Sequence, residues 1–172
     1  MRRNSKFNNL GNIIDTINMY RTNRKISRII LHCSATPIGR DVDVFAIDRM
    51  HLKRFGKSSG CGYHYIIKLD GTIEKGRWVD AVGGHAKGNN RDTIGICYIG
   101  GVKPVKGKLV SVFNAMTKEQ EEATNRLTKS LMKLYNLSSS KVLGHNELPK
   151  VHKDCPCISM DKFRANLDTK GR

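Results

Sequence analysis

Residues 29–33 read Ile-Ile-Leu-His-Cys, an apolar run interrupted by a single histidine. A short apolar run that ends at Ser34 and is followed by the break Thr36-Pro37 is typical of a buried strand. His32 falls at the carboxyl end of this strand, which is where rigid scaffolds present reactive side chains. We therefore expect both the fold and the chemistry of this chain to be organised around residues 29–33.

Further strands are predicted on the carboxyl side of this run. Residues 63–69 form a strand, Asp70-Gly71 is a tight-turn signal, and residues 72–75 return as its hairpin partner. Residues 94–99 form another apolar strand, which we expect to end at Gly100-Gly101. A short strand over 141–143 leads directly into Gly144-His145.

Helices are predicted between and after these strands. Residues 43–55 form one helix, and Thr117 with Gln120 makes a capping box for a long helix that ends near Tyr135. Ser159 caps a last helix. Strands that alternate with helices, together with one hairpin, predict an α/β fold in which helices flank a mixed central β-sheet.

The length of 172 residues suits one domain, which we assign to residues 29–172. Residues 1–28 are predicted to be a basic N-terminal extension with a short amphipathic helix, because apolar side chains recur at helical spacing at Leu10, Ile13, Ile14 and Ile17. No run is long enough to cross a bilayer, and no secretory signal is recognisable. We therefore expect the protein to reside in the cytoplasm of the cell that makes it.

The charge balance predicts attraction to polyanions. The chain carries 31 Lys and Arg against 15 Asp and Glu, a net charge of +16. Aromatic residues make up only 6%, and no zinc-finger spacing is present, so no stable nucleic-acid partner is expected. Five cysteines in a chain without a signal argue against a disulfide framework. Cys33 and Cys97 lie in apolar runs and are expected to be core residues.

Three residues follow strands in a pattern that suits a metal. His32 ends the first strand, His145 follows a late strand, and Cys155 lies in the next loop before Pro156. Two imidazoles and a thiolate suit Zn²⁺ and leave a fourth position for water, as a catalytic site requires. The spacing alone leaves structural roles open for each of the six histidines.

The chain resembles the zinc amidase family that includes phage amidase-type lysozymes and peptidoglycan recognition proteins. The resemblance covers residues 29 to about 163 and follows the family's order. The stretches that carry it are Ile30 to Thr36, Gly62 to Ile67, Asp70-Gly71-Thr72, Gly84 to Asn89, Ile94 to Cys97, and Gly144-His145 with Cys155-Pro156.

This resemblance implies a peptidoglycan recognition protein/amidase-like single domain with N-acetylmuramoyl-L-alanine amidase activity. It implies that zinc-activated water hydrolyses the lactyl–L-alanine amide bond of peptidoglycan. The implied zinc ligands are His32, His145 and Cys155, and the implied catalytic residues are Tyr63 and Lys153. The implied substrate-binding residues are His85, Lys87 and Asn89.

The loop between His145 and Cys155 is longer than in phage relatives, so its alignment with the family can shift. A shifted alignment makes Lys150 the active lysine in place of Lys153, or Cys157 the ligand in place of Cys155. His152 is a further candidate ligand. Glu147 is an alternative candidate for a catalytic role, as the general base, because a carboxylate two residues past a ligand is within reach of a bound water.

The combined features favour a phage endolysin that acts on the cell wall after release. Its expected partners are peptidoglycan and the anionic polymers of the envelope, and a monomer is expected. A competing hypothesis is a peptidoglycan-binding module without turnover. Another is an amidase with a second, regulatory role toward a polymerase.

Overall fold

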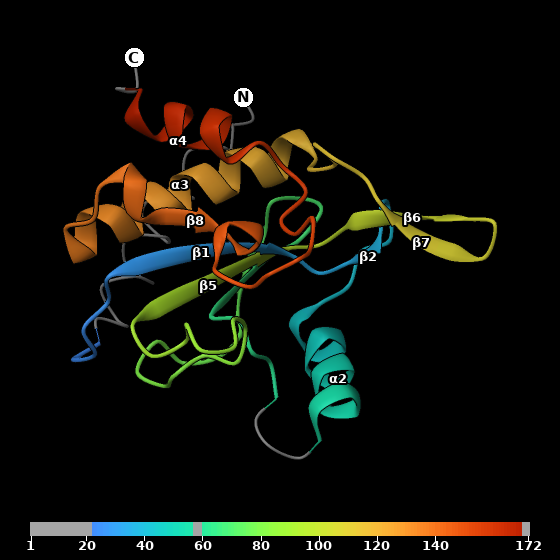
Figure 1. The fold of residues 1–172 in the computed structure, drawn as a ribbon, viewed down its shortest axis with the longest axis horizontal. Coiled ribbons are helices and arrows are strands. Elements are labelled where there is room, and N and C mark those ends of the chain that lie inside the picture. The colour runs from blue at the N-terminus through green and yellow to red at the C-terminus, as the bar shows by residue number, and fades with distance from the viewer. Residues whose placement is uncertain (1–21, 57–59, 170–172) are drawn as a thin grey trace, which may run out of the picture.

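The computed structural model describes residues 22–56 and 60–169, which fold around a five-stranded sheet (Figure 1). The strands lie in the order β4-β3-β5-β1-β8. Neighbouring strands are parallel except β3 and β4, which form the hairpin predicted at Asp70-Gly71. The predicted mixed sheet is confirmed, and its strands are β1 (Arg28–Cys33), β3 (Tyr65–Ile67), β4 (Ile73–Lys75), β5 (Thr93–Tyr98) and β8 (Val142–Gly144).

Helices cover both faces of this sheet. Helices α3 (Lys118–Tyr135) and α4 (Met160–Asp168) lie over one face, and α2 (Val44–Phe55) lies on the other side (Figure 1). Short 3₁₀ turns, η2 (Ser139–Lys141) and η3 (His145–Glu147), flank β8. The predicted caps are confirmed, because Thr117 and Gln120 bond reciprocally at the start of α3 and Ser159 accepts a bond from the Lys162 amide.

The alternation of side chains along β1 decides where His32 lies. Ile29 and Leu31 are buried in the core beneath α3 and α4. Ile30 points to the opposite face, where it packs in a separate cluster with Leu148. His32 follows on the same face as Ile30, because successive strand residues alternate. The histidine is thus directed away from α3 and α4, toward the loops of the second face.

A second, three-stranded sheet was not predicted. It consists of β2 (Thr36–Pro37), β6 (Gly101–Val105) and β7 (Lys108–Ser111), and the β6–β7 hairpin projects from the body of the protein (Figure 1). The chain was expected to leave the sheet region at Gly100-Gly101, but both glycines adopt positive φ angles and redirect it into β6. Residues 103–111 are exposed and lack an apolar alternation that would predict a strand.

The structure also differs from the sequence-based prediction in the length of one strand and in the burial of one helix. The strand expected over 63–69 is shorter, at Tyr65–Ile67. Helix α2, predicted over 43–55, buries only Ile47, and Phe55 at its end is 59% exposed. The predicted amphipathic helix near Leu10 lies outside the described residues. None of the helices in the described ranges is long and apolar enough to span a bilayer.

The described end of the 1–28 segment packs on the domain. Strand β1 already begins at Arg28, and Ile26 is buried in the core cluster beneath α3. Arg28 also pairs with Asp92 at 3.0 Å, next to the start of β5.

Candidate metal centre

Two neighbouring parallel strands bring the predicted ligands together. Leu31 of β1 pairs with Gly144 of β8, so the next residues, His32 and His145, lie side by side with ring centroids 4.5 Å apart. The loop after η3 returns Cys155 to the same place, where its Sγ lies 3.8 Å from His32 Nδ1. One ligand atom from each of the three residues lies within 4.8 Å of the other two.

The donor set and spacing of His32, His145 and Cys155 suit zinc. Typical Zn–S and Zn–N bond lengths at tetrahedral angles place sulfur and nitrogen about 3.6 Å apart. The observed separation of Cys155 Sγ and His32 Nδ1, 3.8 Å, is close to this value. Three protein donors also leave one tetrahedral position open to solvent or substrate. The residues present therefore fit a catalytic zinc ion.

The electrostatics keep both imidazoles in the form that binds metal. Burial lowers the pKa of His32 well below its ordinary value, and the neighbouring His85 and His145 lower it further. Burial also lowers the pKa of His145, followed by the charge of Lys153. Both rings are therefore neutral at neutral pH, with a lone pair available to a metal.

The two predicted catalytic residues lie beside this cluster. The ring of Tyr63 is half-buried, and its centroid is 5.1 Å from that of His32. Burial raises the pKa of the Tyr63 hydroxyl, and the thiols of neighbouring cysteines raise it further, so the hydroxyl stays protonated at neutral pH. Lys153 is exposed, and its charge contributes to the lowered pKa of both His32 and His145.

The predicted substrate-binding residues occupy different environments. His85 is buried, and its Nδ1 lies 3.0 Å from His32 Nε2. Lys87 is exposed, and the half-buried Asn89 accepts a hydrogen bond from Arg28 through its side-chain oxygen. Contact of these three residues with the substrate stays a prediction.

Of the two candidate cysteines, the structure brings Cys155 to the histidines. Cys157 is buried, and its Sγ lies 3.7 Å from that of Cys33. Cys33 and Cys97 are buried in the core, as predicted. The side chains of Lys150 and His152, in the loop that precedes Cys155, are exposed.

The second candidate for the general base, Glu147, is engaged elsewhere. Its carboxylate accepts two hydrogen bonds from Arg164 of α4, at 2.8 and 2.9 Å, and one from the Gly144 amide. Burial alone would raise the pKa of Glu147, but these hydrogen bonds lower it. The carboxylate therefore links η3 to α4.

Sequence reasoning missed a second polar region, which lies around the buried His64. Arg24 lies within 3.4 Å of the buried His64, whose Nδ1 accepts a hydrogen bond from the Gly95 amide. The Arg24 guanidinium donates to five backbone carbonyls, those of Val79, Ala81, Asn90, Arg91 and Thr93. No local signal separates Arg24 from the other basic residues of the 1–28 segment.

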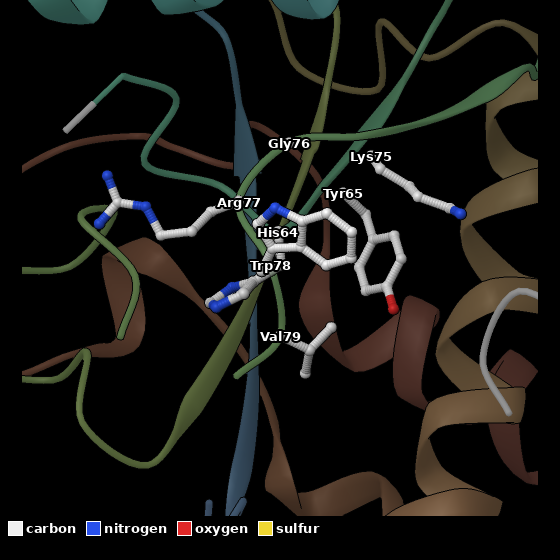
Figure 2. Close-up of a pocket in the computed structure, with 7 residues that line it drawn as sticks. All are labelled: His64, Tyr65, Lys75, Gly76, Arg77, Trp78 and Val79. Atoms are coloured by element: carbon white, nitrogen blue, oxygen red, sulfur yellow. The ribbon is translucent and has the colours of Figure 1, made fainter. Parts of the chain in front are cut away.

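His64 also lines a cavity of about 210 Å³. Figure 2 shows Trp78 beside His64, with the side chains of Arg77 and Lys75 extending to opposite sides. None of the three clustered residues lines it. The lining residues are His64, Tyr65, Lys75, Gly76, Arg77, Trp78 and Val79.

Comparisons with known proteins agree with this geometry. Residues 22–158 match the sequence family described as N-acetylmuramoyl-L-alanine amidase. The chain is 35% identical over 147 residues to the endolysin of Escherichia phage T7, covering 84% of this chain and 89% of that protein.

Solved structures of an amidase and of a peptidoglycan recognition protein share the fold of this chain. An endolysin N-acetylmuramoyl-L-alanine amidase from Clostridium intestinale is 30% identical with a TM-score of 0.67, covering 86% of this chain and 87% of that one. The peptidoglycan recognition protein SD of Drosophila, 23% identical with a TM-score of 0.59, shares the fold over 78% of this chain and 76% of its own.

Proposed function

This chain belongs to the N-acetylmuramoyl-L-alanine amidase family and is a peptidoglycan amidase related to phage endolysins, and we propose that it hydrolyses the lactyl–L-alanine amide with zinc-activated water. The observation that carries the proposal is the convergence of His32, His145 and Cys155 within 4.8 Å. These residues come from separate parts of the chain, and a shared metal explains why two imidazoles and a thiol meet there.

His32, His145 and Cys155 would hold the metal as two neutral imidazoles and a thiolate. A zinc ion bound by such ligands supplies a Lewis acid that makes water nucleophilic near neutral pH. The lowered pKa values of His32 and His145 favour loading, because no proton has to leave either ring.

Lys153 and Tyr63 are assigned to the reacting amide. The exposed ammonium of Lys153, close enough to affect both histidines, is suited to stabilise the oxyanion that develops on the substrate carbonyl. The protonated hydroxyl of Tyr63 is suited to donate a hydrogen bond or to pass a proton to the departing amine. The 85–89 loop, through His85, Lys87 and Asn89, is assigned to substrate binding.

Digestion of purified peptidoglycan, followed by mass spectrometry, tests the proposal. The expected products are intact stem peptides with a free L-alanine amine and glycan strands with free lactyl groups. A chelator should abolish their release and added zinc should restore it. Release that continues in chelator would contradict the metal requirement. Zinc binding without any release would support a binding module that lacks turnover.

The net charge of +16 supports attraction to the anionic polymers of the envelope. We assign the protein to the cytoplasm of the producing cell, as a monomer that reaches the wall after release. Wall digestion should slow as salt is raised, because charge attraction is screened within about 8 Å at physiological ionic strength. A rate that does not change with salt would remove electrostatic attraction from the proposal.

A further inference from the structure

The two ring nitrogens of His32 face different groups. Its Nδ1 faces Cys155, and its Nε2 lies 3.0 Å from Nδ1 of His85. The two imidazoles meet edge to face, with an angle of 81° between their planes. Only 1% of His32 and 8% of His85 is exposed, so solvent has little access to the contact between the rings.

The chain of hydrogen bonds continues from His85 to a backbone carbonyl. Thr93 Oγ1 lies 3.3 Å from His85 Nε2, and the Thr93 hydroxyl donates to the Asn89 carbonyl at 2.6 Å. A carbonyl has no proton to give, so the single hydroxyl proton of Thr93 is committed to Asn89. The Thr93 oxygen is therefore the acceptor in its contact with His85.

This order of donors and acceptors determines which nitrogen carries each proton. His85 must bear its proton on Nε2 to donate to Thr93, and a neutral ring then has a lone pair on Nδ1. That lone pair accepts the Nε2 proton of His32. A neutral His32 with its proton on Nε2 has a lone pair on Nδ1, the atom that faces Cys155.

The surroundings hold the His85 ring in this position. A Cβ at Gly95 would lie 2.6 Å from the ring, and a Cβ at Gly83 would lie 2.5 Å from it, so the ring occupies space that only glycine leaves free. The Asn90 side-chain oxygen accepts hydrogen bonds from the amides of His85 and Ala86, at 3.0 and 2.8 Å. The ring and its backbone are thus fixed independently.

We propose that His85 and Thr93 are positioning residues that hold His32 in the tautomer with Nδ1 open to the metal. The inference rests on the proposed zinc site and assigns its supporting groups. A ligand histidine commonly donates its second N–H to a carboxylate, carbonyl or water. Here the acceptor is a second imidazole, that of His85, whose own orientation is set by Thr93. We call the contacts from His32 through His85 to Thr93 the relay.

Variants at Thr93 test the relay with little change in shape. Zinc affinity, measured by competition with a chelator, should fall roughly 10-fold in Thr93→Val, which lacks the acceptor oxygen, and should be largely restored in Thr93→Ser. The matched control is Thr124→Val, which removes a buried hydroxyl that bonds only within α3. Equal affinities for Thr93→Val and the wild type, or an equal loss in Thr124→Val, would overturn the relay.

Variants at His85 extend the test. His85→Leu removes the acceptor of His32 and should lower zinc affinity by roughly 10- to 100-fold, whereas His85→Asn keeps an acceptor at the position of Nδ1 and should retain more affinity. Thermal unfolding of the zinc-free variants identifies any that fail to fold. Equal affinities for His85→Leu and His85→Asn in folded protein would contradict the proposal.

A direct reading of the tautomers separates this inference from the proposed function. Nitrogen-15 NMR of the histidine rings in the metal-free wild type should show protons on Nε2 of both His32 and His85. A proton on Nδ1 of His32 would overturn the relay, even if the enzyme binds zinc and is active. A wild type that binds no zinc would overturn the zinc site, while the observed tautomers would still decide the relay.

Discussion

His32 and His64 are both 1% exposed and both lie against His85, yet they differ in what the protein leaves free. His64 has both ring nitrogens near backbone groups, the Gly95 amide at 3.0 Å and the Ala81 carbonyl at 3.2 Å. His32 instead contacts a side chain through Nε2, the His85 imidazole at 3.0 Å, and directs Nδ1 toward Cys155. Burial therefore does not distinguish the proposed ligand His32 from the structural His64, whereas an uncommitted ring nitrogen does.

The cations next to these two histidines, Lys153 near His32 and Arg24 near His64, differ in the same way. Lys153, on the side of His32, is exposed and acts on the histidines through its charge. Arg24, on the side of His64, donates to five backbone carbonyls and joins the loops around residues 79–81 and 90–93. The charge of Lys153 thus acts on side chains of the proposed metal site, whereas the Arg24 guanidinium holds the backbone.

The largest expected difference comes from replacing each histidine by glutamine. His32→Gln should abolish amide hydrolysis and lower zinc affinity by more than about 100-fold, since supporting residues alone reach that range. His64→Gln should keep zinc and lower the free energy of unfolding by about 1–3 kcal/mol, because a buried amide loses its acceptor. Metal analysis and thermal unfolding measure both. Loss of zinc from both variants would remove the distinction.

The second prediction concerns Lys153. Lys153→Ala should lower kcat by roughly 10²–10³ while zinc content and thermal stability stay unchanged, because a transition-state charge partner is lost. Lys150→Ala is the matched control, an exposed lysine in the same loop, and should keep full activity. The opposite pattern would transfer the catalytic role to Lys150.

The third prediction uses pH. Burial lowers the pKa of His64 to about 4 in the folded protein, against an unfolded value of 6.5. The unfolded state therefore takes up this proton first, and stability that is complete above pH 6.5 is lost as pH falls toward 4. At pH 4.5 the loss from His64 is roughly 2–3 kcal/mol. Urea unfolding of zinc-free protein at pH 7 and 4.5 should show a smaller decrease in His64→Gln than in the wild type, and equal decreases would refute the assignment.

The smallest effect is expected at Arg24. Arg24→Gln leaves several carbonyls without their donor and should lower the free energy of unfolding by about 1–3 kcal/mol, with zinc content unchanged. Arg40→Gln, at an exposed position, should change it by no more than about 0.5 kcal/mol. Loss of zinc in Arg24→Gln would show that the hydrogen bonds around His64 also affect the proposed metal site.

The sequence predicted best what depends on neighbouring residues. Helix α3 was predicted from Thr117 and Gln120, because a capping box is local chemistry. The resemblance to amidases is confirmed by the family match. Position at strand ends indicated His32 and His145, and the structure brings them together.

What the sequence did not predict depends on distant residues. The β2-β6-β7 sheet joins residues 36–37 to 101–111 through exposed strands without alternation. The carbonyl partners of Arg24 lie 55 to 69 residues away, and the partners of His85 include His32, 53 residues earlier. No local pattern reports such contacts, so the structural role of Arg24 and the ring contact of His85 needed the fold.

The placement of the three clustered residues along the chain also bears on synthesis. His32 is translated before His145 and Cys155, and Cys155 follows His32 by 123 residues. A nascent chain or a truncated fragment that ends before residue 145 contains one of the three donors and cannot assemble the centre. We therefore expect a chain that stops before residue 145 to lack the proposed metal site and to release no stem peptide from peptidoglycan.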